Sequence, residues 1–264
     1  MDIYRIFGRK QLLSIALCAV ILCAVLLTAT GGAASVTAST QQRLLPIYAV
    51  GREENDKVIS ISFDAAWGNE DTQTLIDILG RYDITATFFL VGEWVGKYPE
   101  SVKQLSDAGH EIMNHSDTHP HMSKLSRDQM RKEIESCNDR IEAITGVRPT
   151  LFRAPYGEYC DGLIQVLDEL GMHCIQWDVD SLDWKDPTPG DICSRVCSHV
   201  TPGSICLFHN AAKNTPAALP MLIEQLLADG YTFVPISKNI HTGSCTIDHT
   251  GRQWPTEKQT VPSA

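Results

Sequence analysis

The chain has 264 residues, of which 43% are hydrophobic and 20% are charged, so it is long and apolar enough to form one large globular domain. Its formal net charge is −10 at pH 7. This acidic balance excludes a protein that binds nucleic acid or an anionic lipid surface through a basic patch, and it leaves neutral polysaccharides open as partners.

Residues 1–30 have the pattern of a membrane anchor or a signal peptide. Arg5, Arg9 and Lys10 precede an apolar run, residues 12–30, that contains no charged residue. The run has roughly the ~20 residues that a membrane-spanning helix needs, and the cations before it predict a cytoplasmic N-terminus. The small residues at 31–35 also suit signal peptidase, so both a retained anchor, which the length of the run favours, and a cleaved signal are open. In both cases we expect the remaining chain outside the cytoplasm.

Residues 31–55 are rich in Ala, Ser, Thr and Gln and then polar, and they are predicted to be a linker. From residue 56 short apolar runs typical of strands alternate with segments that have apolar residues at helical spacing. The predicted strands are residues 57–63, 86–91, 110–114, 150–153, 173–179, 204–208 and 231–235. The predicted helices are residues 72–82, 99–108, 126–145, 161–170, 190–200 and 216–228.

Strands that alternate with helices predict a parallel sheet with right-handed crossovers. Residues 56–240 form one predicted domain, and its seven strands favour a (β/α)7 barrel, slightly smaller than the eightfold version. An open, doubly wound sheet is the alternative. Residues 241–264 are polar and rich in Thr, and we expect this tail to be disordered or loosely packed.

The cysteines do not predict a disulfide framework. Seven of the nine lie outside residues 1–30, an odd number without a repeated spacing. Cys193 and Cys197, with His199 nearby, resemble metal ligands, but they lie in a predicted helix and lack a second cysteine pair. We therefore interpret them as small buried residues.

Polar residues of catalytic types follow successive predicted strands. Because the carboxyl ends of parallel strands in a barrel open onto one face, we expect these side chains to converge there in an active site. They are Asp64, His115, His119, Arg153, Asp180, Asp183 and His209. Structural alternatives are open for three of them, since Asp64 could cap a helix, Arg153 could form a structural ion pair, and Asp180 is more simply a loop residue that bonds to backbone.

His115 and His119 are four residues apart and follow the same predicted strand. One turn of helix or a tight loop directs two imidazoles with this spacing toward one point, where their nitrogens can share a divalent metal. The spacing alone is a weak signal, because a pair of this kind arises often by chance. The other polar residues at the same end of the predicted sheet give it weight.

Five short motifs occur in a fixed order along residues 55–240. They are Ser62-Phe-Asp-Ala65, His115-Ser-Asp-Thr-His119, Arg153-Ala-Pro-Tyr-Gly157, Asp180-Ser-Leu-Asp-Trp184 and Ile205-Cys-Leu-Phe-His209. In these motifs the chain resembles the polysaccharide deacetylases, the NodB homology family or carbohydrate esterase family 4. The variant first motif, Phe-Asp-Ala-Ala-Trp-Gly, the predicted membrane segment and the short ectodomain resemble the sporulation-associated branch of that family.

The resemblance implies a deformed (β/α)7 barrel that removes N- or O-acetyl groups from peptidoglycan or chitin-like sugars with a divalent metal. His115 and His119 would hold the metal, which is zinc, or else cobalt, nickel or manganese. Asp64 would be the general base, and Arg153 would hold its carboxylate through a charge-assisted pair.

The remaining motif residues have implied roles in acid catalysis and substrate binding. His209 would be the general acid, with Asp183 raising its pKa. The backbone N–H of Tyr156 would receive the oxyanion. Two residues would line the acetyl pocket and one would stack on a sugar ring; they are Trp184 and Leu207 for the pocket and Trp67 for the ring.

The chain departs from the family pattern at Ala65. Active members carry at this position a second Asp, which completes the metal site with the two imidazoles. Without it the site is expected to be weak, unless Asn69, Glu70 or Asp71 reaches it. The alternative is a protein that has lost deacetylation and acts as a carbohydrate-binding or structural factor in the cell wall or spore.

The implied partners are a cell-wall polysaccharide and, through the N-terminal helix, a membrane. The implied location is the cell surface or the forespore envelope. No feature of the sequence predicts an oligomeric state.

Overall fold

The computed structural model describes residues 43–256. The predicted anchor or signal at residues 1–30, the first part of the linker and the end of the tail lie outside the described residues. Within residues 43–256, none of the helices has the length and apolar character needed to cross a membrane.

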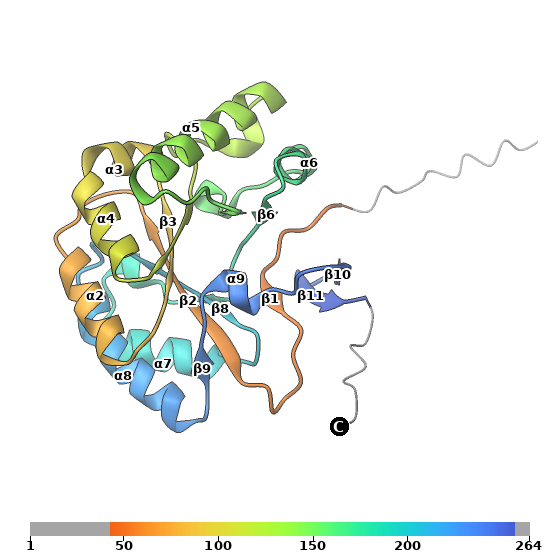
Figure 1. Cartoon of the computed structure of the whole chain (residues 1–264). Coiled ribbons are helices and arrows are strands. Elements are labelled where there is room, and N and C mark those ends of the chain that lie inside the picture. Colours follow the sequence, from red (N-terminus) through yellow and green to blue (C-terminus); the bar gives the residue numbers. More distant parts are fainter. Residues whose placement is uncertain (1–42, 257–264) are drawn as a thin grey trace, which may run out of the picture. The chain divides into compact units, whose positions relative to one another are not determined.

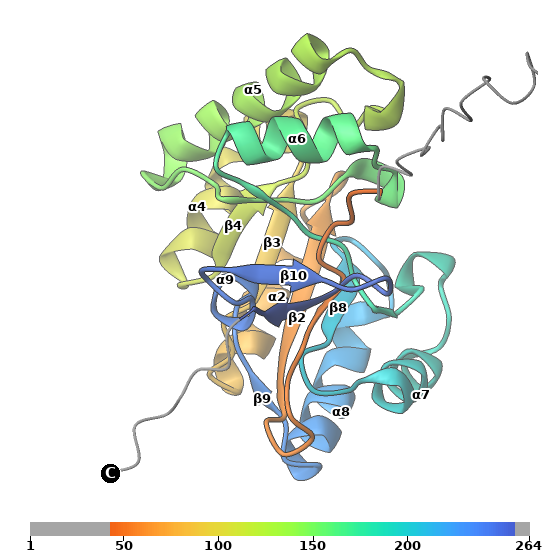
Figure 2. The ribbon, with the colours of Figure 1, turned by 90° about the vertical axis from the view of Figure 1, so that its right-hand side faces the viewer.

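A curled parallel sheet forms the centre of the fold, with the strand order β6-β5-β4-β3-β2-β8-β7, and β9 pairs with the beginning of β2 (Figure 2). The strands are β2 (Val58–Ala65), β3 (Thr87–Leu90), β4 (Glu111–Asn114), β5 (Leu151–Phe152), β6 (His173–Cys174), β7 (Val179–Asp180), β8 (Ile205–His209) and β9 (Thr232–Phe233). Consecutive strands β2 to β6 are neighbours and the chain returns to β2 through β7 and β8. This is the order of a barrel and not of a doubly wound sheet.

Helices cover the outer face of the sheet, and Figure 1 shows α2, α4 and α8 side by side on it. The helices are α2 (Thr72–Arg81), α3 (Gly92–Lys97), α4 (Pro99–Asp107), α5 (Arg127–Thr145), α6 (Asp161–Glu169), α7 (Pro189–His199), α8 (Thr215–Ala228) and α9 (Ile236–Asn239). In α5, the longest of them, Ser126 forms a capping box with Gln129 and Gly146 ends the helix at a φ of 72°. Helix α3 was not predicted, because a single short turn carries too few residues to show a helical period.

The alternation of residues in β2 separates the core from the site. Ile59, Ile61 and Phe63 pack into the hydrophobic core under the helices, and Phe63 stacks on Phe88 with ring centroids 4.8 Å apart. The residues between them, Ser60, Ser62 and Asp64, are also buried but belong to the other face of the strand. The reactive carboxylate of Asp64 is therefore held by a strand whose opposite face is anchored in the core.

The predicted strand at residues 173–179 is two strands at opposite edges of the sheet. β6 pairs with β5, whereas β7 pairs with β8, so the ladder of the central sheet is not closed. Residues before β2 lie in this opening: Ile47 N donates to Cys174 O (2.9 Å), Gln176 N donates to Ile47 O (2.7 Å), and Ala49 forms an antiparallel bridge with Ser204. The prediction that residues up to 55 are a linker is therefore wrong for residues 47–50, which are part of the domain.

The expectation of a disordered or loosely packed tail is wrong for residues 245–255. They form β10 (Cys245–Ile247) and β11 (Arg252–Pro255), and β11 also pairs in parallel with β1 (Ala49–Val50). This small sheet lies on the side of the central sheet opposite α2, α4 and α8 (Figure 1). Hydrogen bonds to distant segments hold this polar sheet in place, and Ile247 packs against the hydrophobic core.

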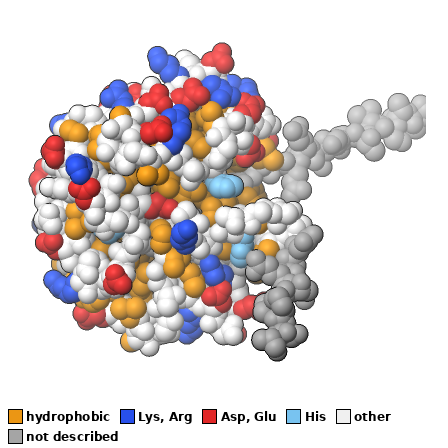
Figure 3. All heavy atoms as spheres, viewed as in Figure 1, with side chains coloured by type: hydrophobic (Ala, Val, Ile, Leu, Met, Phe, Trp, Pro, Cys, Tyr) orange, Lys and Arg blue, Asp and Glu red, His pale blue; other side chains and the backbone are white. Residues whose placement is uncertain are grey.

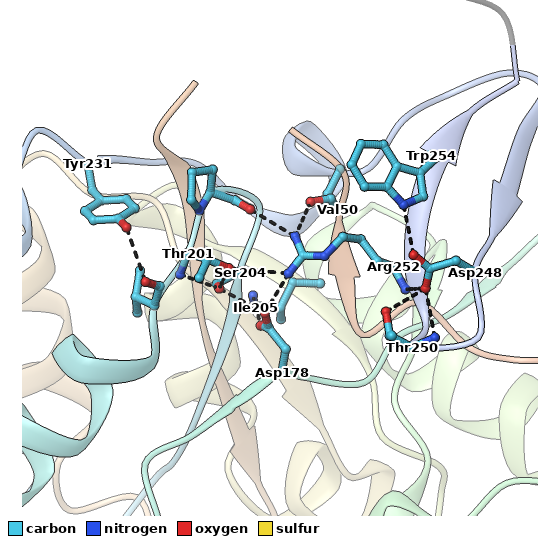
Figure 4. Close-up of polar contacts among 12 residues, drawn as sticks. Val50, Asp178, Thr201, Ser204, Ile205, Tyr231, Asp248, Thr250, Arg252 and Trp254 are labelled. Atoms are coloured by element: carbon cyan, nitrogen blue, oxygen red, sulfur yellow. Dashed lines mark hydrogen bonds and ion pairs between the residues drawn. The ribbon is translucent and has the colours of Figure 1, made fainter. Parts of the chain in front are cut away.

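Arg252 joins the tail to the rest of the domain (Figure 4). Its Nη1 donates to Val50 O (2.8 Å) and to Pro202 O (3.0 Å), and its Nη2 lies 3.5 Å from Asp178 Oδ2. These contacts connect segments that are 50 to 202 residues apart in the sequence.

We expect Arg252→Ala to lower the free energy of unfolding by about 1–3 kcal/mol, because Val50 O and Pro202 O lose the guanidinium as hydrogen-bond donor and Asp178 loses an ion-pair partner. Urea denaturation measures the effect. Arg148→Ala is the control, since Arg148 pairs only with the exposed carboxylates of Asp139 and Glu142 and its loss should cost about 0.5 kcal/mol or less. Equal destabilisation by the two variants would contradict a locking role for Arg252.

Candidate active site

The predicted reactive side chains lie at the carboxyl ends of the parallel strands. Asp64 is the last residue but one of β2, and His209 is the last residue of β8. The others lie in the loops that follow β4, β5 and β7. Because these strands are neighbours in one sheet, their ends bring the residues together from distant parts of the chain. The residues in those loops are His115 and His119, Arg153, and Asp183.

Asp64 and Arg153 form a buried ion pair. Arg153 Nη1 donates to Asp64 Oδ1 (2.8 Å), while Nη2 donates to Ser62 Oγ (2.9 Å) and Gln176 O (3.2 Å). Burial alone would raise the pKa of Asp64, but the charges of Arg153 and the neighbouring imidazoles outweigh it and hold that pKa below its ordinary value. The carboxylate is therefore ionised at neutral pH and can accept a proton.

His115 lies against this pair. Its Nδ1 is 2.8 Å from Arg153 O, and as the backbone oxygen can only accept, Nδ1 carries the proton. Its Nε2 is then an acceptor and faces Asp64 Oδ2 at 3.5 Å. Burial lowers the pKa of His115, so the imidazole is neutral at pH 7 and has a free lone pair.

His119 completes the imidazole pair. Its ring lies edge-on to that of His115, with centroids 5.0 Å apart. Burial and the neighbouring His115 lower the pKa of His119 to about 4, so this ring is also neutral at pH 7.

The loop that carries the imidazole pair is held by residues that the sequence did not indicate. Ser116 and His119 have positive φ values of 69° and 58°, and His119 N donates to Ser116 Oγ (3.0 Å). Glu133 of α5 accepts hydrogen bonds from the backbone N–H groups of Asp117 (3.0 Å) and Thr118 (2.8 Å). Glu133 lies in a helix with many exposed charges, so no local pattern distinguishes it.

His209 and Asp183 form the second polar pair. His209 Nδ1 is 2.7 Å from Asp183 Oδ1, and Asp183 Oδ2 accepts from His209 N (2.9 Å) and from the Thr215 hydroxyl (2.7 Å). Burial alone would lower the pKa of His209, but the hydrogen bond to Asp183 and the charge of Asp64 raise it above its ordinary value. The structure thus places Asp64 and His209 beside each other on paired strands, a carboxyl group with a lowered pKa next to an imidazole with a raised pKa. Thr215, which orients Asp183, was not predicted.

A metal is implied by the family pattern, and the donor set fits one only in part. His115 and His119 supply two neutral nitrogens beside the Asp64 carboxylate. Within the described part of the chain there is no group of three His, Cys, Asp or Glu side chains placed to hold a metal ion. Ala65 is 1% exposed and belongs to the hydrophobic core. The residues present therefore fit a divalent cation held by two imidazoles. This is one protein ligand fewer than in active members of the family.

The acidic loop after β2 does not supply the missing ligand in this structure. Asn69 Nδ2 donates to Ser101 Oγ (2.9 Å), Glu70 Oε2 accepts from Asn69 N (3.0 Å), and Asp71 Oδ2 accepts from Ala211 N (2.8 Å). Asp180 Oδ1 likewise accepts from Leu182 N (2.9 Å), which is the loop contact that we expected for it.

Three aromatic side chains near the site are exposed. Tyr156, Trp184 and Trp67 are 59%, 54% and 53% exposed, which is unusual for such large side chains and leaves their faces open to a ligand. The Tyr156 ring lies 4.6 Å from that of His119, and its backbone adopts a φ of 61° in the Pro-Tyr-Gly turn. The Trp67 ring lies nearly parallel to the His209 ring, at 6.3 Å and 11°.

Leu207 and the surface charges complete the description of the predicted residues. Leu207 is 2% exposed within β8, where it is the strand partner of Ser62 in β2. On the face shown in Figure 3, Lys and Arg side chains are interspersed with Asp and Glu. This distribution agrees with a protein that does not recognise its ligand through a broad basic surface.

We expect Asp183→Asn to shift the pH dependence of activity. An acid must be protonated to act, so activity falls as the pH rises through the pKa of His209. Removing the charge of Asp183 lowers that pKa, and the falling limb of the kcat profile should move to lower pH. Asp191→Asn, in which the lost carboxylate accepts a hydrogen bond from Thr188, the N-cap of α7, should leave the limb in place. An unchanged limb in Asp183→Asn would show that Asp183 does not set the pKa of the acid.

Comparison with known proteins agrees with this geometry. Residues 51–175 match the family model of polysaccharide deacetylase. The uncharacterized protein YlxY of Bacillus subtilis is 34% identical over 73% of this chain and 60% of its own length. A peptidoglycan-N-acetylglucosamine deacetylase of Bacillus cereus is 31% identical over 74% of this chain and 72% of its own length.

The solved structure of BA3943 of Bacillus anthracis, described as a CE4 family pseudoenzyme, is also similar. It is 37% identical, covers 73% of this chain and 68% of its own, and has a TM-score of 0.70. A mutant of BA3943 is described as having restored enzymatic activity. The present chain spans 60% or less of the length of several curated relatives, YlxY among them. The matched family model, the identities and the shared fold show that the chain belongs to the polysaccharide deacetylase family, carbohydrate esterase family 4 with the NodB homology domain.

Proposed function

We propose that the protein hydrolyses acetyl groups from the amino sugars of a cell-wall polysaccharide of the peptidoglycan type. The observation that carries the proposal is that Asp64, bound to Arg153 (2.8 Å), and His209, bound to Asp183 (2.7 Å), are paired residues at the ends of the neighbouring strands β2 and β8. Membership of the family, and relatives named as peptidoglycan deacetylases, support the substrate class. The first motif favours the spore cortex as the form of this polymer.

Asp64 begins the reaction as the base. Its carboxylate takes a proton from water, and the oxygen of that water attacks the acetyl carbonyl carbon. Arg153 keeps the carboxylate ionised and fixes its orientation through the 2.8 Å hydrogen bond. The backbone N–H of Tyr156, in its exposed turn, is the donor proposed for the oxyanion.

His209 completes the reaction as the acid. It donates its proton to the sugar nitrogen, the carbon–nitrogen bond breaks, and acetate and the free amine leave. Asp183 binds Nδ1 of His209, so the proton that is transferred is on Nε2. His115 and His119 would hold a divalent metal, zinc or a similar ion, which supplies polarisation of the carbonyl and acidification of water.

A second candidate function is carbohydrate binding without hydrolysis. Ala65 stands where active members of the family carry a metal-binding carboxylate, and it is buried in the hydrophobic core. A similar structure is that of a pseudoenzyme. The exposed Trp67, Tyr156 and Trp184 would then serve only to bind sugar rings.

Acetate release from peptidoglycan and from chitooligosaccharides, with and without added Zn²⁺ or Co²⁺, tests the proposal. We expect release that increases when the metal is added and that the Asp64→Asn variant abolishes. The metal content of the purified protein is measured in parallel. Sugar binding without any acetate release, at any metal concentration, would refute hydrolysis and establish the second candidate.

We propose that the domain acts outside the cytoplasm, because three basic residues precede the apolar run of residues 12–30. Protease added to intact protoplasts should therefore degrade residues 55–240. A cytoplasmic protein of the same cells is the control and should remain intact. Protection of the domain would overturn this location.

A further inference from the structure

Two loops of the candidate site are joined by one buried amide. Asn210, which follows the acid His209 at the end of β8, is 4% exposed. Its Nδ2 donates to Trp67 O (2.6 Å) and to Gly68 O (2.8 Å), both in the loop after β2. Its backbone N donates to Asp64 O (3.1 Å). Asn210 thus binds the end of β2 at Asp64 and the loop that carries Trp67, and it directly follows His209 in the chain.

Two further hydrogen bonds and one close approach fix the path of the loop after β2. Ala211 N donates to Asp71 Oδ2 (2.8 Å), and Trp94 Nε1 donates to Gly68 O (2.5 Å). Gly68 has a φ of 55°, and a Cβ at this position would lie 2.8 Å from Ala211 Cβ, closer than two carbon atoms tolerate. The loop after β2 therefore has a defined path against the loop after β8.

The amide of Asn210 is poorly explained by stability alone. Its Oδ1 is buried and has no hydrogen-bond partner among residues 43–256, which costs free energy. What the amide achieves is a fixed position for the Trp67 backbone, whose exposed indole lies 6.3 Å from the His209 ring and nearly parallel to it. An exposed indole face beside the acid is suited to stack on a sugar ring and to hold that ring at the acid.

We infer that Asn210 is a positioning residue that holds Trp67 over His209, so that indole and imidazole form one wall of a binding site for an N-acetylated sugar ring. The identity of the ligand rests on the proposed function, whereas the placement of Trp67 does not. Asn210→Asp is the sharpest test, because it keeps the size of the side chain, removes both N–H donors and directs a carboxylate at two carbonyl oxygens.

Tryptophan fluorescence measures the placement directly. A protonated imidazole close to an indole quenches its emission, so Trp67 emission should fall as His209 is protonated. The carboxylates that act on this imidazole are Asp183, Asp64 and Asp180. The difference between the protein and its Trp67→Phe variant isolates this signal from the other four tryptophans of the five in the chain. We expect the pH-dependent quenching in the wild type and its loss in Asn210→Asp.

Asn214→Asp is the matched control. Asn214 lies on the same loop, and its Nδ2 donates to a single carbonyl, Pro187 O (2.8 Å), on another loop. This variant should keep the quenching of Trp67, which a general loosening of the loop would remove. Quenching that persists in Asn210→Asp, or that is absent from the wild type, would overturn the placement of Trp67.

Binding of chitotetraose, measured by calorimetry, tests whether Trp67 and His209 form the sugar wall, that is, one wall of a sugar-binding site. Asn210→Asp and Trp67→Ala should each weaken binding by about tenfold, and Asn214→Asp should not. Wild-type affinity in Asn210→Asp, or no binding by the wild type, would refute the sugar wall. Loss of quenching and of binding in Asn210→Asp, in a protein that never releases acetate, would uphold the inference and refute hydrolysis. If the protein releases acetate and Asn210→Asp keeps the quenching, hydrolysis is upheld and the inference about Asn210 is refuted.

Discussion

Asp64→Asn and His209→Ala should each lower kcat for acetate release by about 100-fold or more, the usual effect of removing a general base or a general acid. Asn cannot take a proton from water, and Ala cannot give one to the departing amine. Both residues lie at strand ends, outside the hydrophobic core. The loss should therefore appear in kcat while the fold remains.

Stability needs to be measured with these variants, because Asp64 neutralises the fully buried Arg153. Asn retains an oxygen that can accept from the guanidinium, which limits the cost of leaving that charge without its partner. Asp180→Asn is the matched control. It removes a carboxylate that also lies at the end of a strand, but this carboxylate accepts a hydrogen bond from the loop backbone at Leu182 N. Full activity in Asp64→Asn or His209→Ala would remove that residue from the mechanism, and an equal loss in Asp180→Asn would point to a general effect of charge.

Ala65→Asp should tighten the binding of Zn²⁺ by at least tenfold, which corresponds to about 1.4 kcal/mol. The substitution adds a carboxylate next to Asp64, where active members of the family place the third metal ligand. Because Ala65 is 1% exposed among apolar side chains, the new charge should lower the thermal stability of the metal-free protein. Added Zn²⁺ should restore that stability, since a metal that binds the folded state stabilises it.

The outcomes of Ala65→Asp distinguish the two candidate functions. Tighter metal binding with a rise in acetate release means that the native protein is a deacetylase limited by its metal site. Tighter binding without release, with Asp64 and His209 intact, means that the substrate site serves binding only. Unchanged affinity would show that His115 and His119 do not form the metal site. Ala66→Asp is the control, because it places the same charge one residue further along and outside the strand.

Whether the sequence predicts a structural feature depends on how far apart in the chain the interacting residues are. The predicted helix at residues 126–145 agrees with α5, since its ends are set by the caps Ser126 and Gly146, which act within a few residues of the chain. The convergence of Asp64, Arg153 and His209 was predictable for a similar reason. Each lies at the end of a strand or directly after it, and the ends of parallel strands meet whatever the details of the packing.

The errors concern segments whose partners are remote. Residues 173–179 are continuous in hydrophobic pattern, but Ile175 bridges Ile47 and the two halves pair with opposite edges of the sheet. The polar tail is held by Arg252, which donates hydrogen bonds to Val50 O and Pro202 O. Hydropathy does not predict these contacts. Local pattern predicts whether a residue is buried and cannot tell which strand covers it.

The sequence by itself determined the class of the fold, the positions of Asp64 and His209 at the ends of strands, and the absence of a carboxylate at Ala65. These follow from strand and helix periods and from the order of short motifs, which are properties of neighbouring residues. Only the tertiary structure decided that Thr215 orients Asp183, that Glu133 shapes the loop of the two imidazoles, and that Asn210 places Trp67 beside His209. Each of these contacts joins loops or helices from different parts of the chain, and a hydrogen bond forms only when folding brings its donor and acceptor to about 3 Å.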